Sequence, residues 1–573
     1  MRADRSETAT LDPGDWDAFR TSLHAAADRA LDHLETRSER PVWRPVSETV
    51  KAAIDEPLPV DPQGIARVIE DIEAFVLPYD TGNTHPRFFG WVHGAGTAGG
   101  MVAELFAAAI NANLGGRDHG AVYIERQVLK WACRMFGLPD GAGGLLVSGT
   151  SMATLIALTV ARNVKSNGDL RADGLRAQSR PLVGYASAEA HSSVAKAFEI
   201  LGLGGRALRS VPVDENFSID AGALRDAIRK DVAAGNQPFA VIGTAGTVNT
   251  GAIDPLDEIA DICSAHDLWF HVDGAFGGLA VLAQAQADKV RGIERADSIA
   301  FDFHKWLHVP YDAGCVLLRD GDLQRQTFAT RPDYLQGLER GLAGGDPWFC
   351  ELGPELSRGF RALKVWLTLK EHGVARLGAM IARNCAQAEY LAGRVTAEHG
   401  LELLAPVSLN ICCFRFTGGE LGADRTDELN KEIVIQLQER GIAAPSTTWI
   451  DGRLAIRVNI TNHRTRTADL DLLVNAVLEL GHDLLFSEQF TGAGTDERRC
   501  GADRARELPQ ASVTDAMPVL DRALSGPEIA ALAGNVSIKI APRIDTVFRL
   551  EKGVVHLHPS GLRSVPAASV LLR

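Results

Sequence analysis

Cysteine is scarce in this chain, which holds eight among its 573 residues. No two of them form a Cys-x-x-Cys pair, and Cys412 and Cys413 stand next to each other within an apolar run. A disulfide framework or a zinc site needs several cysteines at regular spacings. The sequence therefore predicts no metal site, and it indicates structural thiols in a reducing compartment such as the cytoplasm.

Long apolar runs are also missing. No stretch approaches the roughly 20 residues of a membrane-spanning helix, and the polar start from Met1 to Glu7 lacks the apolar core of a secretory signal. A net charge of −14 argues against nucleic acid as a main partner. With 46% apolar and 23% charged residues, the composition is that of a globular protein large enough for several domains. We therefore expect neither membrane nor nucleic acid among its partners.

The pattern of apolar residues divides the chain into four parts. Residues 1–85 form an N-terminal helical segment that prolines interrupt. Residues 86–370 form a large α/β domain, because short apolar runs typical of buried strands alternate there with helix-like stretches. The strand candidates are residues 145–147, 181–185, 239–242, 268–272, 298–301 and 315–318.

The C-terminal part of the chain predicts further elements. A helix over 356–374 leads into a smaller α/β domain, residues 371–486, with strands at 409–414 and 454–458 and a helix at 468–486. Residues 487–573 are a polar linker followed by a β-containing tail. Its segment 547–557 reads as a hairpin that turns at Lys552-Gly553.

Lys305 and Asp273 are the most informative pair of residues. Each follows a strand candidate directly, Asp273 in Phe-His-Val-Asp-Gly-Ala and Lys305 in Phe-His-Lys-Trp. Pyridoxal phosphate (PLP) enzymes need a lysine that forms a Schiff base with the cofactor and an anion that keeps the ring nitrogen protonated. The pair therefore predicts a PLP site.

Other candidate contacts also follow strand candidates. Ser148-Gly149-Thr150-Ser151 stands before a helix-like run, where free amides and hydroxyls bind a phosphate dianion. His191 offers an imidazole to stack on a flat ring, Thr247 a contact to that ring, and His304 a contact to the phosphate. Each of these residues alone is as well explained by a helix cap, a turn or a surface position.

Together, the segments resemble the group II PLP-dependent decarboxylases, the family of aromatic-amino-acid, histidine and glutamate decarboxylases. The similarity covers about residues 40–485. The matching segments are His85 to Phe89, Ser148 to Ser151, Ala190 to Ser193, Gly246 to Asp254, His271 to Ala275, His304 to Trp306, and Arg361 to Lys364.

The resemblance implies PLP fold type I, the aminotransferase-like fold, and a homodimer with active sites at the interface. It implies decarboxylation of an L-amino acid to the amine and carbon dioxide. Lys305 would bind the cofactor and Asp273 would pair with its ring nitrogen, while His191 and Ala275 would lie against the two faces of the ring. The phosphate would be held by Gly149, Thr150, Ser151 and His304.

Two departures from the family pattern bear on the reaction. Arg117, Asp118 and His119 stand where the family's aromatic-specific members have apolar pocket residues, so we expect polar or acidic substrates to be at least as good as aromatic ones. The loop before Arg358 usually carries a tyrosine that protonates the substrate carbon, and no tyrosine occurs between Gln336 and Arg358. Phe349 stands near that position and predicts a side reaction with oxygen.

Other outcomes stay open at this point. The same lysine and aspartate would serve oxidative deamination coupled to decarboxylation, a transaminase or a lyase, since the fold does not fix the reaction. A PLP-binding regulatory or scaffold protein without catalysis, with the tail as its interaction module, is an alternative of another class.

Overall fold

A computed structural model gives the fold of the chain. It describes residues 10–330, 337–419 and 421–486, together with the backbone of four strands between residues 535 and 571. The chain divides into two compact units, Met1–Gly494 and Thr495–Arg573. Each unit is described by itself.

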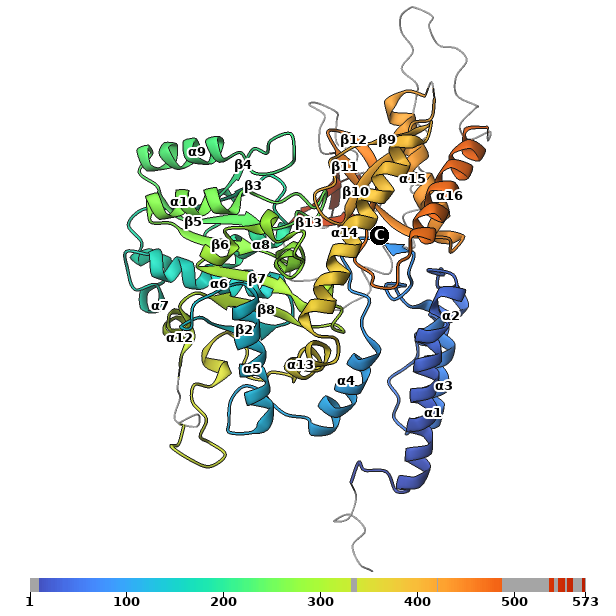
Figure 1. Ribbon diagram of the computed structural model, residues 1–573, viewed down its shortest axis with the longest axis horizontal. Coiled ribbons are helices and arrows are strands. Elements are labelled where there is room, and N and C mark those ends of the chain that lie inside the picture. The colour runs from blue at the N-terminus through green and yellow to red at the C-terminus, as the bar shows by residue number, and fades with distance from the viewer. Residues whose placement is uncertain are drawn as a thin grey trace, which may run out of the picture. The chain divides into compact units, whose positions relative to one another are not determined.

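A seven-stranded sheet forms the centre of the first unit (Figure 1). β8 runs antiparallel to both of its neighbours, and the pairs from β7 to β4 are parallel. In order across the sheet, the strands are β2 (Gly143–Val147), β8 (Gly314–Leu318), β7 (Ser298–Asp302), β6 (Trp269–Asp273), β5 (Gln237–Thr244), β3 (Leu182–Ser187) and β4 (Leu208–Val211).

Six of these strands confirm the sequence prediction, and β4 was missed. β4 lies at the edge of the sheet, where only Val211 of its four residues is buried. A half-exposed edge strand carries no continuous apolar run, so periodicity gives no signal for it.

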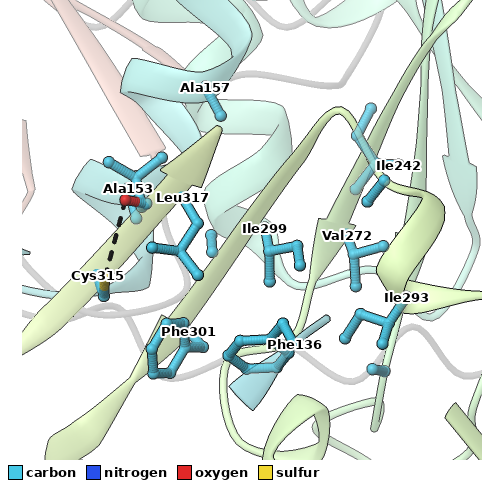
Figure 2. Close-up of a cluster of buried hydrophobic side chains, with 14 of the residues drawn as sticks. Phe136, Ala153, Ala157, Ile242, Val272, Ile293, Ile299, Phe301, Cys315 and Leu317 are labelled. Carbon is cyan, nitrogen blue, oxygen red and sulfur yellow. Dashed lines mark hydrogen bonds between the residues drawn. The ribbon is translucent and has the colours of Figure 1, made fainter. Parts of the chain in front are cut away.

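Helices pack on both faces of this sheet and enclose the main core. α6 (Thr150–Lys165) contacts five of the strands. Figure 2 shows Ala153 and Ala157 of α6 near Leu317, and Phe136 beside Phe301; the two phenyl rings are 4.9 Å apart. The further helices are α4 (Ala98–Ile110), α5 (Gly120–Met135), α7 (Leu170–Asp173), α8 (Ser192–Ile200), α9 (Ala221–Ala233), α10 (Leu256–His266), α11 (Phe303–Trp306), α12 (Gly321–Phe328) and α13 (Arg361–His372).

The helix predicted over 356–374 is shorter than expected. α13 begins only at Arg361 and ends at His372, where Gly373 takes a φ of +70° that glycine adopts readily, and α14 (Val374–Ala397) begins directly after it. α14 leads into the smaller domain.

The smaller domain has a five-stranded sheet with its own core. In order its strands are β1 (Phe88–Phe89), β11 (Ala444–Ile450), β12 (Arg453–Asn459), β10 (Ile411–Phe416) and β9 (Leu401–Leu403), and α15 (Ala423–Glu439) and α16 (Thr467–Leu485) complete it. Phe88, which we assigned to the large domain, pairs with Ala444 of this sheet. Two phenylalanines alone carry no signal for a partner more than 350 residues away.

The N-terminal segment is helical, as expected. It contains α1 (Trp16–Glu35), α2 (Glu48–Ile54) and α3 (Ile65–Asp71), and α1 and α3 lie side by side (Figure 1). Asp15 caps α1 by accepting the N–H groups of Asp17 and Ala18.

The second unit contains a four-stranded antiparallel sheet of β13 (Asn535–Lys539), β14 (Asp545–Glu551), β15 (Val554–Pro559) and β16 (Ser569–Leu571). β14 and β15 pair antiparallel up to Glu551 and Val554, as expected for the hairpin over 547–557; its turn at Lys552-Gly553 lies outside the described residues.

Candidate active site

Four segments that carry chemistry end side by side at one edge of the central sheet. Thr244 of β5 is paired with Asp273 of β6, and Asp302 at the end of β7 is paired with Gly314 of β8. Val147, the last residue of β2, is paired with the same Gly314. The turns after these strands therefore meet at their carboxyl ends, where α/β sheets bind ligands.

A cavity of about 430 Å³ lies at this edge. Most of the predicted site residues line it, although they come from separate parts of the sequence. They are Gly149, Thr150, Ser151, His191, Asp273, Ala275, His304 and Lys305. The fold thus brings together the candidate lysine, its candidate anion and the predicted phosphate turn.

Lys305 lies on α11, directly after β7. Its Nζ is 2.9 Å from Oδ2 of Asp302, a carboxylate that is only 3% exposed. The lysine side chain is 22% exposed, so its amine stands at the wall of the cavity and remains within reach of a small molecule.

Asp273 is the last residue of β6 and is almost fully buried. One of its carboxylate oxygens accepts the N–H of Ala275 at 3.2 Å. Burial raises the pKa of Asp273, and the positive charge of Lys305 and the hydrogen bond from Ala275 oppose this rise. A protonated ring nitrogen placed next to Asp273 would add a further charge that favours the ionised carboxylate.

His191 caps α8 and lines the cavity. Its Nδ1 accepts the N–H of Ser193 at 3.2 Å and lies 2.8 Å from the hydroxyl of the same serine. Since Nδ1 is an acceptor, Nε2 carries the proton of the neutral ring. The cap fixes the ring orientation and leaves one N–H to be used in the cavity.

The turn at the start of α6 has the donors that an anion needs. Thr150 donates its N–H to Oδ1 of Asp302 at 2.7 Å, while its hydroxyl is buried and has no hydrogen-bond partner within the described ranges. His304 accepts the N–H of Ala313 on Nδ1 at 3.0 Å, so its Nε2 carries the proton. Burial lowers the pKa of His304, which makes it a neutral donor.

Thr247 does not line the cavity, whereas Thr244, Gly246 and Val248 around it do. Its hydroxyl is 3.1 Å from that of Thr250 and accepts the N–H of Ala252. The side chain is thus used within its own turn. A contact between Thr247 and the cofactor ring stays a prediction.

The cavity wall includes Asp302 and Tyr311, which sequence reasoning did not single out, and also Trp91 and His93 from the stretch after the His-Pro segment, which the family resemblance had placed near the pocket with only one aromatic ring. The His93 ring stacks on Trp91 at 5.7 Å, and the Tyr311 ring is 4.4 Å from that of His304. Residue 94 must be a glycine here, because a Cβ would collide with the carbonyl oxygen of His304. The only local signal was the nearness of Asp302 and Tyr311 to Lys305 in sequence.

The polar segment at 117–119 does not line the cavity of its own chain. The Arg117 guanidinium lies 4.3 Å over the ring of Trp348, and Asp118 accepts the hydroxyl of Tyr123 at 2.7 Å. His119 is the residue before α5. Two of these three side chains therefore pair with neighbours in the same chain.

Phe349 also lies away from the cavity. It is 3% exposed and belongs to the main core, with the Arg358 guanidinium 5.0 Å above its ring. The segment from Gln336 to Arg358 contains no tyrosine, but Tyr334 stands two residues before it. Residues 331–336 lie outside the described residues, but the sequence does offer a phenol close to this interval.

The fold and the site define a PLP-dependent enzyme, and comparison with known proteins identifies the family. The pyridoxal-dependent decarboxylase conserved domain matches residues 47–417. The chain is 35% identical to the aromatic-L-amino-acid decarboxylase of Bacillus atrophaeus over 81% of its own length and 95% of that protein. It therefore belongs to the pyridoxal-dependent decarboxylase family.

Two further proteins illustrate the range of its relatives. The L-2,4-diaminobutyrate decarboxylase of Rhizobium meliloti is 30% identical over 81% of this chain and 92% of that protein. The crystal structure of Oryza sativa TDC with PLP and tryptamine matches with a TM-score of 0.76 and 26% identity, covering 83% of this chain and all of that one.

These findings confirm the fold type I prediction and the reaction class. The chain is a PLP-dependent amino-acid decarboxylase, a carboxy-lyase. Within the described ranges, no helix is long and apolar enough to cross a membrane. The same part of the chain has no cluster of three or more metal-ligating side chains.

Proposed function

We propose that Lys305 binds PLP covalently, that Asp273 pairs with its ring nitrogen, and that His191 lies against the ring. The observation that carries this assignment is their convergence on one cavity with the turn at the start of α6. Bound PLP supplies an electron sink for the bond that breaks at the substrate Cα. Asp273 sustains that sink by its negative charge, and buried surroundings strengthen this interaction.

The residues around the turn fit a phosphate group. Thr150 has a buried hydroxyl that lacks a partner within the described residues, and Ser151 lines the cavity beside it. At the start of α6 the N–H of Thr150 is bonded to Asp302 and that of Met152 to the carbonyl of Gly149, so the N–H of Ser151 and the helix dipole remain to favour an anion. His304 adds a neutral N–H.

Aromatic L-amino acids are the substrates that this cavity fits best. Its wall carries the rings of Trp91, His93 and Tyr311 and no arginine that would pair with an acidic side chain. Burial, Lys305 and His304 all lower the pKa of His93, so its ring is neutral and offers no full charge. Arg117 and Asp118 do not line the cavity of their own chain, so the expectation that polar or acidic substrates are at least as good stays a prediction.

Two measurements test the assignment. Borohydride reduction of the PLP-loaded enzyme, followed by peptide mapping, should find the cofactor on Lys305. Lys364, which is bridged to Glu104, serves as the internal control and should stay unmodified. Carbon dioxide release from a panel of amino acids should give the highest kcat/KM for phenylalanine, tyrosine or tryptophan. Higher values for glutamate, aspartate or 2,4-diaminobutyrate would overturn the substrate assignment.

A homodimer completes the proposal. One face of α4 exposes a row of apolar residues, each about half exposed: Val102, Leu105, Phe106 and Ile110. α3 and the residues after it expose a similar row of Ile65, Val68, Ile72 and Val76. Rows of this kind mark protein interfaces, and a second copy is the partner that the family resemblance implies. Light scattering should give about twice the mass of the chain, and Phe106→Glu with Leu105→Glu should lower it.

The cysteines support a reducing compartment. Seven of them lie in the described residues, and all seven are free. Free thiols are kept in compartments that are reduced by glutathione or thioredoxin, as in the cytoplasm. Cell fractionation with an antibody against the chain tests this placement.

A further inference from the structure

Among the described residues, Asp302 is the one acidic side chain that contacts both the candidate phosphate turn and the candidate cofactor lysine. Its Oδ1 accepts the N–H of Thr150 at 2.7 Å, and its Oδ2 is 2.9 Å from Nζ of Lys305. The side chain is 3% exposed. Among the other neighbours, Nε2 of His304 is 3.8 Å from the same carboxylate.

The carboxylate of Asp302 and a phosphate group can both bind to the start of α6. Both are anions that accept N–H groups at a helix N-terminus. A phosphate ester carries a charge of about −1.5 to −2 near neutral pH. A phosphate that binds at Thr150 would therefore lie close to a second, buried negative charge.

The charges around Asp302 determine how large the repulsion is. Lys305, whose Nζ is 2.9 Å from Asp302, offsets only part of the charge of this carboxylate. In a buried site with an effective dielectric constant of about 20, two unit charges 5 Å apart interact by a few kcal/mol. A tenfold change in affinity corresponds to about 1.4 kcal/mol, which is less than half of this interaction energy.

We propose that Asp302 limits the affinity of this enzyme for PLP through repulsion of the cofactor phosphate, while it positions Lys305 before the cofactor binds. The inference rests on the proposed roles of Lys305 and of the turn at Thr150. Because of Asp302, the fraction of enzyme that carries PLP depends on the concentration of free PLP. It acts as a positioning residue, because its contacts are with other side chains and with the turn.

Asp302→Asn tests the proposal, since asparagine keeps an oxygen for the Thr150 N–H and removes the charge. The dissociation constants of PLP and of pyridoxal, which lacks the phosphate, are measured by absorbance titration of the full-length apoenzyme. We expect Asp302→Asn to bind PLP about tenfold more tightly, with little change for pyridoxal. Inorganic phosphate should also raise the melting temperature of this variant more than that of the wild type.

Asp297→Asn is the matched control. Asp297 precedes the same strand β7 at its opposite end and likewise accepts a backbone N–H, that of Phe270 at 2.8 Å, but it does not line the cavity. Its substitution should leave the ratio of the two dissociation constants unchanged. Asp302→Ser provides a second variant without the charge if the asparagine variant folds poorly.

Three results would overturn the proposal. They are weaker or unchanged PLP binding in Asp302→Asn, an equal change for PLP and pyridoxal, and tightening of the same size in Asp297→Asn. An equal change for both ligands would mean that Asp302 acts on Lys305 alone. Failure of the proposed function is distinct, because the wild-type enzyme would then show no borohydride-stable adduct on Lys305.

Discussion

The contact between Gly314 and Gly149 gives a prediction that the structure makes quantitative. Gly314 begins β8, opposite the ends of β2 and β7. A Cβ on Gly314 would collide with Cα of Gly149 and would lie 2.6 Å from its carbonyl carbon, against an ordinary contact of at least 3.4 Å. The partner atoms are backbone, so no side chain can rotate away. Gly314→Ala must therefore move the turn that begins α6 by about 1 Å.

A shift of this size acts on the site directly. The turn carries Thr150, which lines the cavity and whose N–H is bonded to Asp302. Displacement of a positioning group by about 1 Å costs about a hundredfold in rate. We therefore expect kcat/KM to fall about a hundredfold in Gly314→Ala, together with weaker binding of PLP.

The assay compares Gly314→Ala with Gly278→Ala. A Cβ on Gly278 would meet its nearest atom, Cδ1 of Ile293, at 3.5 Å, which is an ordinary contact. Both variants are measured for PLP affinity, for kcat/KM at saturating PLP and for melting temperature. A Gly314→Ala enzyme whose kcat/KM is within twofold of the wild-type value would refute the reasoning. An equal loss of kcat/KM in Gly278→Ala would show that any added Cβ near the sheet lowers activity, and that the contact with the turn has no specific effect.

The remaining predictions concern charge, pH and the loop. Asp273→Asn should keep bound cofactor, seen by its absorbance, yet lose about a hundred- to a thousandfold in kcat, because a preorganised charge is removed; unchanged kcat would exclude Asp273 as the partner of the ring nitrogen. Burial lowers the pKa of His271 to about 3. Below about pH 6.5, this imidazole is therefore protonated in the unfolded chain and stays neutral in the folded one. The free energy of unfolding should therefore fall as the pH drops below 6.5, by up to about 1.4 kcal/mol per pH unit from this residue. In His271→Gln, the urea midpoint should fall less between pH 7 and pH 5 than it does in the wild type. An equal fall in both proteins would contradict the assignment. Phe349 is buried beneath Arg358, so Phe349→Tyr should leave the amine yield per carbon dioxide unchanged, whereas Tyr334→Phe should divert part of the turnover to oxygen. An oxygen electrode measures this, and peroxide equal to carbon dioxide in the wild type would show that the oxidative reaction is the main one.

The sequence alone pointed to the residues that we propose carry the reaction. Ser148, Asp273 and Lys305 each follow a buried strand, and parallel strands bring their carboxyl ends to one edge of a sheet. Local apolar runs were therefore enough to expect that these residues meet. The matching segments then identified the family, because their order and spacing are specific.

Only the tertiary structure decided which neighbours surround these residues. Thr150 and Asp302 are bonded across 152 positions of sequence, and His93 reaches the same cavity as Tyr311. Arg117 lies over Trp348 and Phe349 under Arg358, so neither Arg117 nor Phe349 lines the cavity of its own chain. Local periodicity reports which face of an element is buried, whereas the approach of distant segments is set by side-chain packing throughout the core.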